Sequence, residues 1–225
     1  MRGEGSLAER PLILIGQFDS PFVRRVGIAL RWYGWTFEHR PHAVFRDEAL
    51  IAEFNPLRKV PTLVLDDGTV LTESFVCLES IDELAANEHG EDWDRLLLPR
   101  RGRLRVEGLR LCGFATGAMD KMVTLIYERF VREQRDDAWV ARCTRQVLET
   151  LAYLDNVRAR QTETFLLGSR LSHADVATSC ACTLAQEALP DVLAAREFPA
   201  LRAHSEYCQS MPEFEAVRQP FVINR

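Results

Sequence analysis

The first third of the chain alternates between short apolar runs and stretches with helical spacing. The run PLILIG at residues 11–16 is typical of a buried parallel strand, and residues 21–33 place apolar side chains at helical intervals behind Ser20, the expected N-cap. Asp67-Gly68 is a strong signal for a two-residue turn between two further strands. The other predicted elements are a strand within residues 35–42, a short helix within 45–54 and a helix over 73–86. The predicted order is therefore βαβαββα.

After residue 86 the pattern changes. Residues 87–99 are polar, with Gly90 and Pro99, and every later segment has helical spacing. Helices are expected over about 100–134, 137–162, 172–189 and 198–210, the last ending before Met211-Pro212. The sequence therefore predicts a flexible N-terminus over 1–10, an α/β domain over 11–86, a linker over 87–99 and an all-α helical bundle over 100–225.

Composition narrows the class of protein. The 225 residues are 47% hydrophobic and 27% charged, as in ordinary globular proteins, and the net charge of −5 gives no general attraction to nucleic acid. No run approaches the ~18 apolar residues of a membrane helix, and the start MRGEGSLAER lacks the apolar core of a secretory signal. We expect a cytoplasmic protein with no nucleic acid and no membrane partner.

The six cysteines have no metal-ligand spacing. Two of them, Cys180 and Cys182, are separated by a single residue inside a helical pattern. The others are Cys77, Cys112, Cys143 and Cys208. We expect all six to be reduced and mostly buried small hydrophobic residues, and we expect no metal site.

The segment Asn55-Pro56-Leu57-Arg58-Lys59-Val60-Pro61-Thr62-Leu63 carries the most specific chemistry. A proline just ahead of a strand cannot donate a ladder hydrogen bond and often marks a cis peptide at a site. Such a turn leaves the Val60 backbone free to pair with a bound peptide. Glu73-Ser74 follows downstream, at the start of a predicted helix.

Three segments in combination, Ser20-Pro21-Phe22-Val23-Arg24-Arg25, NPLRKVPTL and Glu73-Ser74, resemble the soluble glutathione transferase family, in its bacterial type with serine at the catalytic position. The resemblance covers nearly the whole chain. It implies a thioredoxin-like first domain, the family's all-α second domain, glutathione as co-substrate, a small hydrophobic electrophile as the second substrate, and a homodimer that joins the first domain of one subunit to the second domain of the other.

The resemblance also implies roles for individual residues. Glu73 would hold the γ-glutamyl amine of glutathione, and Ser74 with the free N–H groups of the helix start would hold its carboxylate. Val60, ahead of Pro61, would pair with the cysteinyl backbone, Lys59 would reach the glycyl carboxylate, and Phe22 would line the thiol site. The alternative readings are that Glu73 and Ser74 only favour a helix start, that Lys59 is a solvated charge, and that Pro61 is a trans edge-strand proline.

Ser20 stands where glutaredoxin-like, omega-like and beta-like relatives place a reactive cysteine. A serine removes the mixed-disulfide route and keeps a hydroxyl donor. Its hydrogen bond, together with the helix dipole, would favour the thiolate of bound glutathione. The alternative is that Ser20 only caps the helix.

Several other features are read as structural. Ser172 and Asp175 have capping-box spacing ahead of an apolar run, and His173 in the same turn is expected to be exposed. Arg24 and Arg25 would either steer an anionic ligand or pair across a subunit interface. The basic cluster between Pro99 and Arg105 is expected to be a solvated helix start.

The first hypothesis for function is an enzyme of detoxification that activates the glutathione thiol for attack on an electrophile. A zeta-like maleylacetoacetate isomerase is less favoured, because the SSCSWRVR pattern of that class is replaced here by FDSPFVRR. The second hypothesis is a non-catalytic binding module of the stringent-starvation-protein type. The intact set of Val60, Pro61, Glu73 and Ser74 favours the enzyme.

Overall fold

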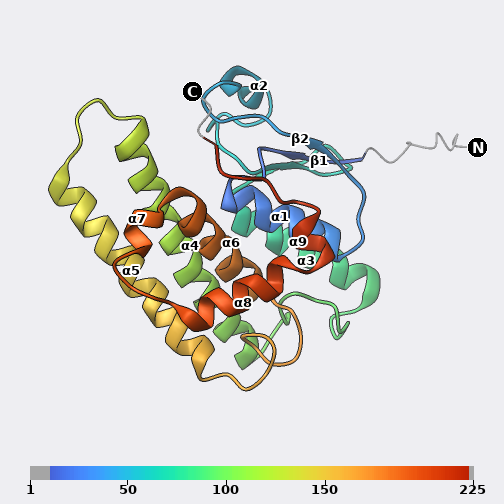
Figure 1. Cartoon of the computed structure of the whole chain (residues 1–225). Coiled ribbons are helices and arrows are strands. Elements are labelled where there is room, and N and C mark those ends of the chain that lie inside the picture. The colour runs from blue at the N-terminus through green and yellow to red at the C-terminus, as the bar shows by residue number, and fades with distance from the viewer. Residues whose placement is uncertain (1–10, 223–225) are drawn as a thin grey trace, which may run out of the picture.

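The computed structural model describes residues 11–222, so the expected flexibility of residues 1–10 lies outside the described part. A four-stranded mixed sheet in the order β2-β1-β3-β4 forms the centre of the first domain (Figure 1). The strands are β1 (Leu12–Ile15), β2 (Phe37–Arg40), β3 (Thr62–Val64) and β4 (Val70–Thr72). β1 is parallel to β2 and antiparallel to β3, and β3 and β4 form the hairpin predicted around Asp67-Gly68.

Three helices complete this domain, and the predicted order βαβαββα is confirmed. They are α1 (Pro21–Trp32), α2 (Glu48–Ala52) and α3 (Ser74–His89). α1 begins at a proline, which suits the first helical position because its missing N–H has no partner there, and Ser20 is its N-cap as predicted. α1 packs between α3 and the second domain, so almost its whole length is buried.

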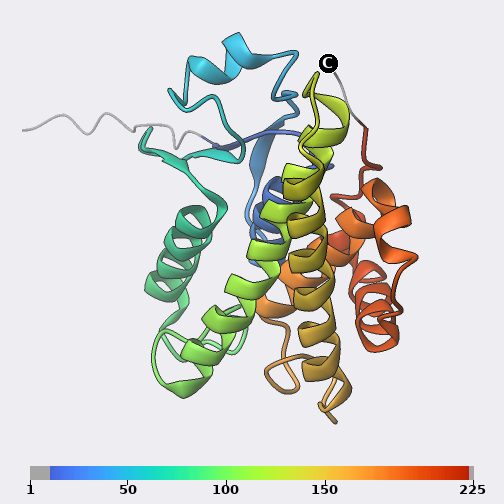
Figure 2. The ribbon, with the colours of Figure 1, turned by 90° about the vertical axis from the view of Figure 1, so that its left-hand side faces the viewer.

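The second domain is all helical. Its helices are α4 (Arg103–Phe130), α5 (Asp137–Ala159), α6 (His173–Ala188), α7 (Pro190–Leu193), α8 (Pro199–Gln209) and α9 (Pro212–Glu215). α4 and α5 form a long antiparallel pair, as Figure 2 shows, and α6 is buried along most of its length between α4, α8 and α1. The fold is therefore a thioredoxin-like domain joined to an all-α domain, as expected.

The short helices α7 and α9 were not predicted. Each begins at a proline, Pro190 and Pro212, which the sequence pattern treats as the end of the preceding helix. The proline does end that helix, but its fixed φ angle also starts the next one.

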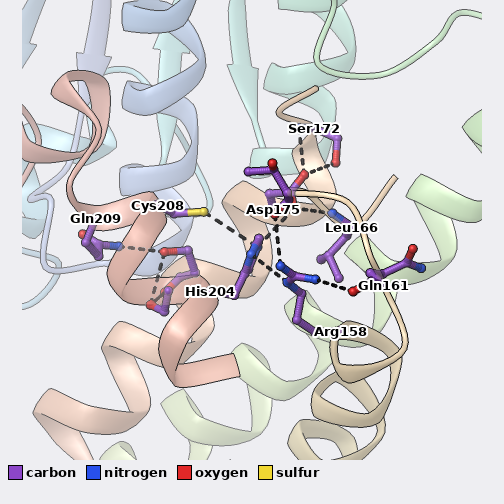
Figure 3. A network of polar contacts seen from close by, with 11 residues as sticks. Arg158, Gln161, Leu166, Ser172, Asp175, His204, Cys208 and Gln209 are labelled. Carbon is purple, nitrogen blue, oxygen red and sulfur yellow. Dashed lines mark hydrogen bonds and ion pairs between the residues drawn. The ribbon is translucent and has the colours of Figure 1, made fainter. Parts of the chain in front are cut away.

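Asp175 is the centre of a buried polar network at the start of α6 (Figure 3). Its carboxylate accepts hydrogen bonds from the backbone N–H of Ser172 at 2.9 Å and of Leu166 at 2.8 Å, and its Oδ1 lies 3.1 Å from Nε2 of His204. Arg158 donates to the other ring nitrogen of His204. The capping box predicted at Ser172 and Asp175 is present, and it also ties α6 to α8 and to the loop before it.

Three predictions about polar residues are wrong, and the first of them concerns His173. His173 is not exposed but 4% accessible, because its Nε2 lies 2.9 Å from Asp82 of α3. Tyr33 also donates to Asp82, so this carboxylate is a polar junction between the two domains. The sequence shows no local sign of it, since Asp82 and His173 are 91 positions apart.

Arg24 and Arg25 are also buried, at 3% and 2%, so neither presents its charge to a ligand or to a partner subunit. Arg25 belongs to α1, which packs against α3 and α6, and the burial of its side chain lowers its pKa. The basic cluster after Pro99 is not purely solvated, because Arg100 and Arg105 both form ion pairs with Glu79 of α3 at 2.9–3.0 Å.

All six cysteines are buried and unpaired, as predicted. Burial raises the pKa of the Cys112 and Cys180 thiols to about 11 and that of Cys77 and Cys182 to about 12, so these sulfurs are poor nucleophiles. Between residues 11 and 222, no helix has the length and apolar character needed to cross a membrane.

Candidate active site

A cavity of about 410 Å³ opens between the two domains. All seven residues that the sequence assigns to catalysis or ligand binding line this cavity: Ser20, Phe22, Lys59, Val60, Pro61, Glu73 and Ser74. They come from three segments of the first domain: the end of the β1–α1 loop with the first turn of α1, the loop that precedes β3, and the start of α3. The fold therefore brings together side chains that are up to 54 positions apart in the sequence.

Ser20 lies at the junction between β1 and α1. Its Oγ accepts a long hydrogen bond of 3.4 Å from the N–H of Val23, and its carbonyl accepts from the N–H of Arg24 at 2.9 Å. The hydroxyl proton is not used in this capping bond, since the hydroxyl acts there as acceptor. Ser20 can therefore cap the helix and donate to a ligand at the same time.

The Val60–Pro61 peptide is cis, as predicted. Asn55 supports the loop before it: its Nδ2 lies 3.0 Å from the carbonyl of Lys59 and 2.9 Å from Oγ1 of Thr72 in β4. The Asn55 side chain is 2% exposed, and its Oδ1 accepts from the N–H of Leu57. Asn55 is part of the NPLRKVPTL segment, but its side chain was assigned no role from the sequence, so this supporting role was missed.

Glu73 and Lys59 face each other across the mouth of the cavity. Lys59 Nζ lies 2.7 Å from Glu73 Oε1, and both side chains are more than half exposed. Glu73 also has a φ angle of 67°, which costs a non-glycine residue about 1–3 kcal/mol and is concentrated at functional sites. Directly after it, Ser74 opens α3, so the free N–H groups of that helix begin at the cavity.

The second domain supplies the opposite wall, which is mainly apolar. Its lining residues are Asp120, Val123, Thr124, Ile126, Tyr127 and Val131 around α4, Leu184 of α6, and the C-terminal Phe221 and Val222. Tyr127 makes an edge-on ring contact with Phe45 at a centroid separation of 5.4 Å, which closes the wall against the first domain. None of these residues carries a sequence motif, so sequence analysis did not find them.

Two carboxyl groups in the cavity have raised pKa values. Desolvation by burial is the main cause for both Asp19 and Asp120. The charges of Lys121 and, to a lesser extent, Lys59 lower the pKa of Asp120 but do not offset the desolvation, and Lys59 itself is paired with Glu73. The second-domain half of the cavity is therefore mainly apolar, with Asp120 as an acidic group, while Asp19 lies in the first-domain loop that carries Ser20.

In the described part of the chain, no group of three or more histidine, cysteine, aspartate or glutamate side chains is placed to hold a metal ion. The polar groups around the cavity instead suit a peptide-like ligand with charged ends: a helix N-terminus, a carboxylate, an ammonium group and a hydroxyl.

A thioredoxin-like domain, an all-α domain and a ligand cavity at their junction define the two-domain fold of the glutathione-binding transferases. Two family models match the chain, the glutathione S-transferase N-terminal domain over residues 19–84 and its C-terminal domain over residues 118–212. The chain belongs to the glutathione S-transferase family.

Individual relatives agree with this assignment. The chain is 39% identical over 69 residues to the uncharacterized GST-like protein YibF of Escherichia coli, a match that covers 31% of this chain and 34% of that protein. The aligned part thus spans about a third of the curated relative's length.

Solved structures match over nearly the whole chain. A glutathione S-transferase from Methylobacterium radiotolerans in complex with glutathione sulfonate has 25% identity and a TM-score of 0.79, covering 95% of this chain and 98% of that one. A family member from Pseudomonas fluorescens with bound glutathione has 27% identity and a TM-score of 0.76, covering 93% and 99%.

Proposed function

We propose that the protein is a glutathione transferase that binds glutathione in this cavity and activates its thiol for attack on a small electrophile. One observation carries the proposal: the seven residues chosen from sequence motifs all line a single cavity at the domain junction. The glutathione and glutathione sulfonate bound in the two structural relatives support it.

The charges of the site match those of glutathione. This tripeptide has an amine and a carboxylate on its γ-glutamyl end and a second carboxylate on its glycyl end. Glu73 binds the amine, and Ser74 with the first N–H groups of α3 binds the adjacent carboxylate, which the helix dipole also favours. Val60 pairs with the cysteinyl backbone, and Lys59 binds the glycyl carboxylate. The ion pair between Lys59 and Glu73 opens as each side chain takes its ligand group.

Ser20 and Phe22 then lie at the central thiol. The Ser20 hydroxyl donates a hydrogen bond to the sulfur, and the N-terminus of α1 adds its dipole, so that the bound thiol ionises below its usual pKa of about 8.5. With an aryl halide, the thiolate forms a carbon–sulfur bond to the ring carbon. The halide leaves with its bonding electron pair, and the thiol proton passes to solvent.

The second-domain wall favours an uncharged electrophile. Its rings and aliphatic side chains supply apolar contact, and its charged lining residue Asp120 is acidic, as is Asp19 on the first-domain side of the cavity. Lys59 is engaged by Glu73 or by glutathione. This electrostatic balance disfavours an anionic substrate and therefore argues against the maleylacetoacetate isomerase alternative.

We also propose that the protein is cytoplasmic, acts in detoxification and forms a homodimer. The dimer would bury large apolar side chains that one subunit leaves exposed on α3 and α4. These are Phe75, Val76, Leu104 and Val106. A sedimentation mass near that of one chain at micromolar concentration would contradict the dimer.

The deciding experiment is calorimetric titration with glutathione, followed by a rate assay with 1-chloro-2,4-dinitrobenzene. We expect saturable binding and conjugation above the uncatalysed rate. Binding without turnover across aryl halides, epoxides, disulfides and peroxides would support the non-catalytic module instead. An absence of binding would refute both.

A further inference from the structure

The last described residues of the chain, 217–222, form a C-terminal strap that returns from α9 toward the first domain. Figure 1 shows this dark red segment leaving α9 and running beside α1 and the sheet. Phe221 and Val222 line the same cavity as Ser20. The strap thus contacts the site, although it lies about 200 positions from Ser20 in the sequence.

Gln219 binds the loop that carries Ser20. Its Oε1 accepts a hydrogen bond of 2.9 Å from the N–H of Phe18, two residues before Ser20. Arg24 closes the connection from the other side, because its Nε donates to the carbonyl of Phe18 at 2.9 Å and its Nη2 donates to the carbonyl of Gln219. Arg24 is 3% exposed, so these bonds form in a low-dielectric environment where they are strong.

Gly27 allows the loop and the strap to meet on α1. A Cβ atom at this position would lie 2.6 Å from the ring of Phe18 and 3.2 Å from Cγ1 of Val217. Arg24 and Gly27 are one helical turn apart, so each contacts both the loop and the strap from the same face. Helix, loop and strap therefore form one packed junction.

Two further hydrogen bonds fix the end of the strap over the cavity. The N–H of Phe221 donates to Oε2 of Glu187 at 2.8 Å, and the N–H of Val222 approaches Oδ2 of Asp19 at 3.5 Å. Asp19 belongs to the Ser20 loop and Glu187 to α6. The strap thus bridges the two walls of the cavity.

We infer that the C-terminal strap is a working part of the active site, an inference that rests on the proposed function. Gln219 is a positioning residue for Ser20, and Phe221 determines which electrophiles fit beside the thiolate. Phe18 is linked to Ser20 in two ways. It lies two residues before Ser20 in the backbone, and Arg24 contacts both residues, because its Nε donates to the Phe18 carbonyl and its backbone N–H donates to the Ser20 carbonyl.

The first test compares Gln219→Ala, Gln219→Glu and Arg218→Ala in the full chain. Gln219→Ala removes the acceptor for Phe18, Gln219→Glu keeps one, and Arg218 is an exposed neighbour on the same strap that does not line the cavity. We expect Gln219→Ala to raise the pKa of the bound glutathione thiol, read from thiolate absorbance, and to lower kcat about ten-fold. Glutathione affinity should stay close to wild type, Gln219→Glu should restore most of the lost kcat because it keeps the acceptor for Phe18, and Arg218→Ala should match wild type throughout.

The second test concerns Phe221→Ala. We expect KM for 1-chloro-2,4-dinitrobenzene to rise about ten-fold, because the ring loses an apolar wall, while KM for the small epoxide 1,2-epoxypropane stays unchanged. If Phe221 had a purely structural role, its loss would change KM for both substrates to a similar extent. Equal effects on both would overturn the assignment of Phe221.

A third readout does not depend on glutathione. Amide hydrogen exchange at Phe18 should be about ten-fold faster in Gln219→Ala than in Arg218→Ala. If wild type conjugates glutathione but Gln219→Ala matches Arg218→Ala in thiol pKa, kcat and exchange, the strap inference is overturned and the proposed function stands. If wild type binds no glutathione, the proposed function fails and the catalytic role of the strap fails with it.

Discussion

Lys59 Nζ lies 2.7 Å from Glu73 Oε1, and these are the two side chains assigned to opposite ends of glutathione. When glutathione binds, Lys59 would pair with the glycyl carboxylate and Glu73 with the γ-glutamyl amine. One ion pair within the protein would thus be replaced by two ion pairs with the ligand. Because both side chains are more than half exposed, the pair itself contributes only about 0–1 kcal/mol to stability. Before the ligand binds, the ion pair holds both side chains at the cavity mouth, and each charge neutralises the other.

The first prediction concerns this pair. Glu73→Gln and Lys59→Ala should each weaken glutathione binding about ten-fold or more, since a lost charged hydrogen bond costs about 1.5–3 kcal/mol, and both should leave the urea midpoint almost unchanged. Glu48→Gln is a matched control, because it breaks an equally exposed ion pair with Arg58 that lies outside the cavity. Calorimetric titration that gives one affinity for all three variants would remove the assignment of both ends.

Ser20 is the subject of the second prediction. If its hydroxyl donates to the bound thiolate, Ser20→Ala should raise the pKa of that thiol and slow conjugation near neutral pH, with little change in glutathione affinity. Ser20→Cys should introduce thiol–disulfide exchange, because a cysteine at a helix N-terminus has a lowered pKa. Superimposable thiolate titration curves for wild type and Ser20→Ala would show that Ser20 is only a cap.

The sequence predicted every element except the short helices α7 and α9, together with the half of the site that depends on local chemistry. Ser20 ahead of Pro21, and Val60 ahead of Pro61, are set by backbone rules that act over a few residues, and these positions are as predicted. The roles of Asn55 and Asp82 depend on partners 17 and 91 positions away, which no local pattern reveals.

The same reason explains the errors at Arg24, Arg25 and His173. Charged and imidazole side chains are usually exposed, so the pattern placed them in solvent, whereas the packing of α1 and α6 buries all three. The second-domain wall of the cavity was missed from the sequence, because Tyr127 and Phe221 occupy ordinary apolar positions that carry no motif and line the cavity only once the two domains pack together.

Asp82 carries the third prediction. It is 1% exposed and lies 2.6 Å from the hydroxyl of Tyr33 and 2.9 Å from Nε2 of His173, so it ties the two domains together. Asp82→Ala should lower the free energy of unfolding by about 3–5 kcal/mol, the cost of breaking a buried polar pair. Exposed Glu83, the next residue, is the control, and Glu83→Ala should be near wild type in urea unfolding. Equal midpoints for the two variants would mean that the junction contributes nothing.

The last prediction concerns pH and Asp19. Burial raises the pKa of this carboxyl group, an effect larger than the opposing hydrogen bonds from Val222 and Ser20 and the charge of Arg24. Between the unfolded pKa of about 3.9 and the raised folded pKa, the folded state therefore binds more protons than the unfolded state. Stability from this group falls as pH rises through that window and is constant above it.

Asp19→Asn removes the titration and keeps an oxygen acceptor for the N–H of Val222. It should therefore be more stable than wild type at pH 7, and the difference should shrink as the pH falls through the raised folded pKa toward the unfolded pKa of about 3.9. Asp191→Asn has the opposite sign, because the hydrogen bond from Arg129 lowers the pKa of Asp191. That variant should be less stable than wild type at pH 7, and its deficit should disappear as the pH falls through the lowered folded pKa. Urea unfolding of the three proteins between pH 2 and 8 measures both differences. An Asp19→Asn protein that is less stable than wild type at pH 7 would show that the contact with the strap outweighs the desolvation of the carboxylate.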